Sequence, residues 1–210
     1  MQSNIEYVIS LGGQCFTANF LKDNNLKLTS YPFDWIFTTP HIILDMLNDN
    51  FEKFLNKDYY VSKNPNDKKN KHSLYLPDLY MFNHRNPIKE GDHKYLKRCV
   101  ERFYKVLQKP GKKLFIMTIL SNEIKNEIEH IHNLNKKLDT ITSNYEIICI
   151  IQKKTGYQTR EIFNYDNLKI VQITTISDSD GLVFMNNDDN EFYKNIINSF
   201  YDFNLKIIDF

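Results

Sequence analysis

Three long runs of apolar residues in the second half of the chain constrain its fold most. They are KKLFIMTIL (112–120), EIICIIQ (146–152) and NLKIVQITTI (167–176). Each run is apolar at successive positions, which is typical of a strand that is buried on both faces. A shorter run of the same kind, IEYVISL (5–11), lies near the start of the chain and predicts a first buried strand.

Helical patterns alternate with these strands. Apolar residues recur at helical spacing in 14–22, 39–55, 92–108, 121–141 and 187–201. Thr39, followed by Pro40, is a candidate N-cap, and so are Ser121 and Asn122. We therefore predict a single α/β domain over residues 1–210, with a mostly parallel central sheet and helices on both faces.

Composition excludes several classes of function. Lys and Arg number 27 against 26 Asp and Glu, so no global basic field indicates a nucleic-acid partner. We interpret the lysine-rich stretch 64–72 as a solvated loop. No signal peptide or run of about 18 apolar residues is present, which predicts a cytoplasmic protein without membrane contact. Three widely spaced cysteines indicate free thiols, and no metal or cofactor motif is evident.

The segment SLGGQC (10–15) joins the first predicted strand to the first predicted helix. Cys15 in the first turn of that helix would lie where the helix dipole favours a thiolate, although a lone cysteine is also a common packed core residue. Gly12 and Gly13 would let the backbone approach a substrate, and the Gln14 side chain could stabilise an oxyanion. The same turn could hold a phosphate, although two adjacent glycines fit GxGxxG poorly.

A thiol nucleophile needs a base and a group that orients the base. Among six histidines we favour His84, because an apolar-aromatic segment leads to it and a loop follows; a purely structural histidine is the alternative. Asp34, between Phe33 and Trp35, is the candidate orienting carboxylate, and a turn-forming role is its alternative. Trp35 is a candidate substrate contact, with a core position as the alternative.

Five segments together resemble one known family. They are SLGGQC (10–15), PFDWIF (32–37), NDNFEKFL (48–55), FNHRNP (82–87) and YLKRCVERFYKVL (95–107). In order and spacing they resemble the DUF1796 family, which is described as papain-like cysteine peptidases. The resemblance covers roughly the first 120 residues.

The resemblance implies a site with Cys15 as nucleophile, His84 as base and Asp34 as third member. It also implies a papain-like arrangement, in which the histidine lies on an antiparallel sheet, so a divergent papain-like α+β fold is the alternative architecture. We predict a cysteine-dependent hydrolase without cofactor that acts on a peptide, acyl or glycan substrate. The alternatives are a glycan- or acyl-modifying transferase or esterase, and a non-catalytic module that binds an anion such as a sugar phosphate.

Overall fold

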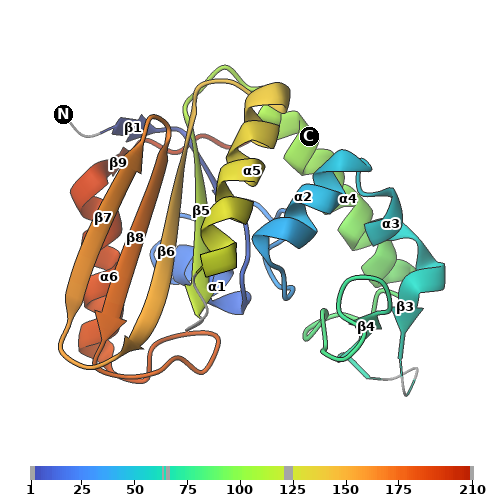
Figure 1. Ribbon diagram of the computed structural model, residues 1–210. Helices are drawn as coiled ribbons and strands as arrows, with labels where there is room; N and C mark the ends of the chain where they lie inside the picture. The colour runs from blue at the N-terminus through green and yellow to red at the C-terminus, as the bar shows by residue number, and fades with distance from the viewer. Residues whose placement is uncertain (1–2, 63, 65–66, 121–124, 209–210) are drawn as a thin grey trace.

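A five-stranded sheet forms the centre of the molecule (Figure 1). The computed structural model describes residues 3–62, 64, 67–120 and 125–208. The strand order is β2-β5-β6-β8-β7. The four parallel strands are β2 (Tyr7–Ser10), β5 (Lys113–Leu120), β6 (Tyr145–Thr155) and β8 (Leu168–Thr175). The predicted mostly parallel sheet is therefore confirmed.

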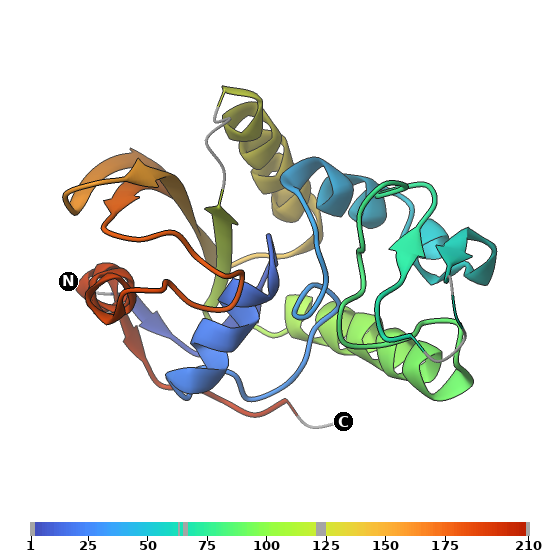
Figure 2. The ribbon, with the colours of Figure 1, turned by 90° about the horizontal axis from the view of Figure 1, so that it is seen from below.

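Helices cover both faces of this sheet (Figures 1 and 2). One face carries α1 (Cys15–Asp23) and α6 (Asn187–Phe200). The other carries α2 (Pro40–Asn48), α4 (Glu90–Leu107) and α5 (Lys125–Ile141). Because β5 and β6 alternate apolar side chains between the two faces, they supply both hydrophobic cores: Phe115 packs with Phe103 of α4, and Ile116 with Tyr193 of α6.

The predicted helix over 39–55 is two helices, α2 and the short α3 (Glu52–Leu55). Asn50 and Phe51, between them, both have left-handed backbone angles, with φ +55° and +64°. This conformation ends the first helix and reorients the chain, so that Phe51 is buried. Thr39 caps α2 as predicted, since its hydroxyl accepts a hydrogen bond from the Ile42 amide at 3.4 Å. The predicted caps Ser121 and Asn122 lie outside the described residues.

Two smaller pairings and one edge strand complete the fold. β7 (Thr159–Tyr165) runs antiparallel to β8 and was not predicted, because most of its side chains are exposed. Beyond α3, a 3₁₀ turn (Lys57–Tyr59) leads to β3 (Tyr60–Val61), which pairs with β4 (Lys71–His72). Between β4 and α4 the described residues form no further strand, only isolated bridges.

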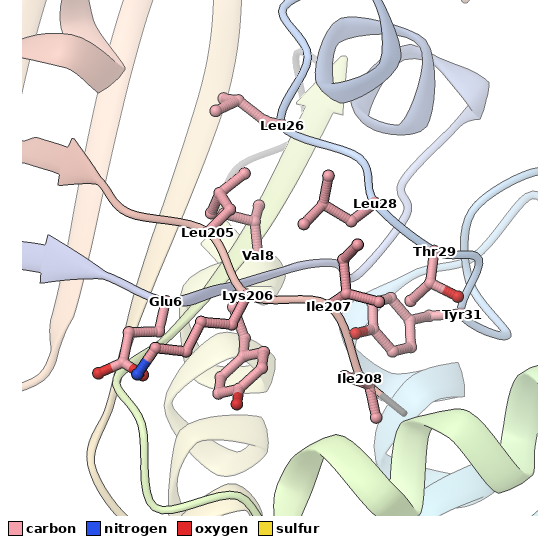
Figure 3. A pocket seen from close by; sticks show the side chains of 11 residues that line it. Glu6, Val8, Leu26, Leu28, Thr29, Tyr31, Leu205, Lys206, Ile207 and Ile208 are labelled. Carbon is pink, nitrogen blue, oxygen red and sulfur yellow. The ribbon is translucent and has the colours of Figure 1, made fainter. Parts of the chain in front are cut away.

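The C-terminal segment covers the free edge of β2. β1 (Ser3–Ile5) pairs in parallel with β9 (Tyr201–Phe203), and the chain then runs beside β2, where the Lys206 amide donates to the Glu6 carbonyl at 2.9 Å. Figure 3 shows the Lys206 side chain reaching the Glu6 carboxylate, with which it forms an ion pair. A small cavity of about 40 Å³ lies beneath this segment. No helix in the described part of the chain combines the length and apolarity needed to cross a membrane.

Candidate active site

Two glycines form the turn between β2 and α1 because the backbone there excludes side chains. Gly12 and Gly13 have φ angles of +77° and +101°, which L-residues rarely adopt. A Cβ on Gly13 would lie 1.9 Å from the Thr118 carbonyl oxygen, and one on Gly12 would lie 2.4 Å from the Thr38 hydroxyl oxygen. The turn is therefore wedged between β5 and the segment before α2.

Both glycine amides are used inside the protein. The Gly12 amide donates to Ser10 Oγ at 3.0 Å, and the Gly13 amide donates to Thr38 Oγ1 at 3.2 Å. Both N–H groups thus have hydrogen-bond partners within the protein in this structure. The role of the two glycines in this structure is to shape the turn.

A chain of hydroxyl groups fixes the start of α1 to the sheet. Thr17 Oγ1 lies 2.9 Å from the Gly12 carbonyl oxygen and 2.8 Å from Thr118 Oγ1 on β5. Thr118 Oγ1 in turn lies 2.7 Å from the Tyr193 hydroxyl on α6. All of these side chains are buried, so the hydrogen bonds act in a low-dielectric interior. The first turn of α1, which carries Cys15, is therefore held from three elements.

The structure brings Cys15 and His84 together. Cys15 is the first residue of α1, and its Sγ lies 3.3 Å from His84 Nε2. The thiol is nearly buried, with 8% of the residue exposed, whereas the His84 side chain is exposed. These two residues lie 69 positions apart in the sequence, so the contact depends on the tertiary fold. A thiol in hydrogen-bond reach of an imidazole is the geometry of an activated nucleophile.

Burial changes the expected ionisation of the thiol. It raises the pKa of Cys15 to about 11, although the backbone amide of Cys15 itself lowers that pKa in part. The helix N-terminus favours the thiolate, but desolvation of the charged form outweighs that effect in this closed arrangement. The thiol is therefore protonated at neutral pH, and its activation requires a base that removes the proton.

Pairing between two irregular segments places His84. Phe82 forms isolated antiparallel bridges with Ile36 and Asn70, and the Phe37 amide donates to the Met81 carbonyl at 2.8 Å. The segment that contains Trp35 thus runs beside the segment that leads to His84. The Trp35 ring meets the His84 ring edge to face, at 5.7 Å between centroids and an interplanar angle of 77°. This contact is suited to hold the imidazole in position.

The loop after His84 is anchored to the first turns of α4. Asp92 accepts hydrogen bonds from the Arg85 guanidinium at 3.1 Å and from the Asn86 amide at 3.0 Å. The Arg85 guanidinium also stacks over the Tyr95 ring, 3.6 Å from its centroid. These anchors are not predicted by the sequence. The sequence signal for them is weak: Arg85 lies a few residues before an acidic residue, Asp92, and an aromatic residue, Tyr95, at a predicted helix start.

The structure does not bring Asp34 to His84. Asp34 is fully buried, and its Oδ2 binds the Lys27 ammonium and accepts the Tyr31 amide at 2.9 Å. Oδ1 has no hydrogen-bond partner among the described residues. Burial raises the pKa of Asp34, while the Lys27 charge opposes that shift. In this structure Asp34 belongs to a buried ion pair under the aromatic segment, not to the thiol and imidazole pair.

Gln14, the residue before Cys15, packs beside the loop after β8. Its side-chain oxygen is 2.8 Å from the position that a Cβ on Gly181 would occupy, so it packs against the loop after β8. Figure 2 shows that loop passing close to α1, and Asn19 of α1 donates to the Leu182 carbonyl at 3.4 Å. The Gln14 side chain forms no hydrogen bond within the described residues.

The contact between Trp35 and His84 leads to a first prediction. Replacing Trp35 with alanine removes an aromatic contact of about 0.5–1.5 kcal/mol, and we expect acetylation of Cys15 by p-nitrophenyl acetate to slow by up to about tenfold. Trp35→Phe keeps an aromatic ring and should recover most of the rate. Both rates are measured by release of p-nitrophenol, with the melting temperature of each variant as a control. A wild-type rate in Trp35→Ala would show that the ring does not position His84.

Comparison with known proteins identifies the family of this chain. A search of curated proteins and a search of solved structures each give no match. A family model described as "Putative papain-like cysteine peptidase (DUF1796)" matches residues 6–155, which is more than half of the chain and includes both Cys15 and His84. The chain therefore belongs to the DUF1796 family.

Proposed function

We propose that this protein is a cysteine-dependent hydrolase of peptide or acyl substrates, with Cys15 as nucleophile and His84 as general base. The single observation that carries the proposal is the distance of 3.3 Å between Cys15 Sγ and His84 Nε2. Membership of a family described as cysteine peptidases supports it. Asp34 is not part of the proposed catalytic pair, because its carboxylate is bound to Lys27 and the Tyr31 amide.

The proposed reaction has two stages. As Cys15 Sγ attacks the substrate carbonyl carbon, His84 Nε2 accepts the thiol proton, which is necessary because burial holds the thiol pKa near 11. The tetrahedral oxyanion faces the Cys15 amide and the Gln14 side chain. Its collapse expels the amine or alcohol, which takes the proton from His84, and leaves a thioester on Cys15. Water, deprotonated by His84, then attacks the thioester and releases the acid and the thiol.

The alternative of an anion-binding module has less support. A phosphate-binding turn presents its backbone N–H groups to the anion. In this turn the Gly12 and Gly13 amides already donate to Ser10 and Thr38. The first-turn amides of α1 remain, and the Cys15 thiol lies among them.

Formation of an acyl-enzyme tests the proposal. After incubation with p-nitrophenyl acetate, we expect an acetyl group on the peptide that contains Cys15, and we expect it to disappear once the ester is consumed. Cys99 and Cys149 are internal controls, because both are fully buried and burial raises the pKa of each thiol. Peptide mass spectrometry measures the acetylation of each of the three cysteines. Absence of a Cys15 adduct, or equal acetylation of the three cysteines, would contradict a nucleophilic role for Cys15.

A further inference from the structure

A cleft begins at the nucleophile turn and extends away along β5. Gly13 and Gln14, the two residues before Cys15, form one end of it. Its volume is about 290 Å³, which is enough for one large side chain of a substrate. Four apolar residues supply much of the lining: Phe37, Pro40, Ile119 and Leu120. An apolar wall of this kind suits the aliphatic stem of a long side chain.

One carboxylate lines the same cleft. Glu127 lies in the first turn of α5, where the helix dipole favours a negative charge. Its Oε2 is buried and has no hydrogen-bond partner, and Glu127 forms no ion pair with any residue that the structure describes. A buried carboxylate oxygen without a partner is costly to desolvate. Among the described side chains, the cleft therefore contains a carboxylate without a partner cation.

His41 does not neutralise this carboxylate at neutral pH. His41 lies close enough to be influenced by Glu127, and its ring is 5.4 Å from the His130 ring. Burial lowers the pKa of His41 and the nearby His130 lowers it further, whereas Glu127 and Asp45 oppose the shift. The result is a His41 pKa below its ordinary value of 6.5, so the ring is mainly neutral at pH 7. His41 is thus not a counter-cation for Glu127 at pH 7.

We propose that this cleft is a substrate subsite for a cationic side chain, with Glu127 as the residue that determines specificity. A lysine or arginine side chain, or an amine of similar length, would place its aliphatic stem against Phe37 and Ile119 and its charged end at the Glu127 carboxylate. The inference rests on the proposed function, because Gly13 and Gln14, which line one end of the cleft, directly precede Cys15 in the chain. A side chain bound there would belong to a substrate residue close to the bond that Cys15 attacks.

The subsite can be tested without the thiol. In ¹⁵N-labelled Cys15→Ala protein, NMR titrations compare the peptides acetyl-Gly-Lys-Gly-amide and acetyl-Gly-norleucine-Gly-amide, which differ by the ammonium group. We expect the lysine peptide to bind about tenfold more tightly, as one ion pair in a partly buried site allows. Adding Glu127→Gln should reduce this preference to within about twofold. Glu129→Gln, an exposed position two residues along the same helix, is the matched control and should preserve it.

The outcomes separate the subsite from the proposed function. Equal binding of the two peptides, no measurable binding of the lysine peptide, or a lysine preference that survives Glu127→Gln overturns the subsite. If Glu127→Gln does not fold, as judged by its NMR spectrum, Glu127→Ala replaces it with the same expectation. A lysine preference that depends on Glu127 supports the subsite even where p-nitrophenyl acetate leaves no thioester on Cys15, a result that would count against the hydrolase alone.

Discussion

Replacing His84 with alanine is expected to slow release of p-nitrophenol from p-nitrophenyl acetate by about 10²- to 10³-fold at pH 7, the usual contribution of a positioned general base. The reason is that burial holds the Cys15 pKa near 11, so without His84 few thiol groups are ionised at neutral pH. The rate is measured from the absorbance of p-nitrophenol under conditions where the ester is in excess.

The effect of His84→Ala on the rate of p-nitrophenol release should depend on pH. In His84→Ala the thiol can lose its proton only to solvent, so its rate should rise about tenfold per pH unit from pH 8 to pH 10, below the pKa of about 11. The ratio of the wild-type rate to the His84→Ala rate should therefore decrease as pH rises. His132→Ala is the matched control, because His132 packs on Tyr165 and not on Cys15. A parallel gap at every pH, or a rate unaffected by His84→Ala, would contradict general-base catalysis by His84.

Replacing Lys27 with methionine is expected to lower the free energy of unfolding by about 3–5 kcal/mol, the usual effect of removing one partner from a buried ion pair. Asp34 is fully buried and the Lys27 side chain is 11% exposed, so solvent cannot replace the lost ammonium. Urea unfolding followed by the fluorescence of Trp35, the single tryptophan, measures the loss. Lys153→Met, which removes a surface contact with Glu161 at 3.5 Å, should cost less than about 1 kcal/mol.

The instability of Lys27→Met should depend on pH in one direction. Burial already raises the pKa of Asp34, and loss of the Lys27 charge removes the effect that opposes this shift. A carboxyl whose folded-state pKa exceeds its unfolded value near 3.9 destabilises the fold progressively as pH rises from the unfolded pKa to the folded pKa, and by a constant amount above it. The loss in free energy of unfolding caused by Lys27→Met should therefore be smaller at pH 5 than at pH 7. Lys27→Met/Asp34→Asn, which keeps an acceptor for the Tyr31 amide, should recover part of the stability and lose this pH dependence. A pH-independent deficit in Lys27→Met would contradict the buried-charge explanation.

The sheet and most of its helices were predictable because their signals are local. The continuous apolar runs that became β5, β6 and β8 can be buried in only one way, between two layers of helices. β7 was missed because an exposed edge strand has no apolar pattern. The break between α2 and α3 was missed because Phe51 adopts a left-handed conformation that its residue type disfavours. Burial of its side chain offsets this strain.

The site was predictable only in part, for a related reason. The position of Cys15 after a Gly turn is a local feature, and the sequence context of His84 distinguished it from five other histidines. The sequence also indicated that Asp34 would be buried among aromatic residues and would need a partner. It did not indicate which partner, since Lys27 is a residue type that is mostly exposed. The choice between Lys27 and His84 depended on tertiary packing, and so did the depth at which Cys15 lies.

The two members of the proposed catalytic pair lie in parts of the fold with unequal support. Cys15 is fixed to the central sheet by the hydroxyl chain through Thr17 and Thr118, whereas His84 follows a segment whose regular pairing consists of two-residue strands and isolated bridges. Segments with few backbone ladder bonds open at a lower free energy than the strands of a central sheet. A transient opening of residues 70–84 would thus separate the base from the thiol while the sheet remains folded. In hydrogen-exchange terms, we expect the lifetime of the proposed catalytic pair to be set by a local opening reaction, and the proposed activity to be lost at a lower temperature than the fold.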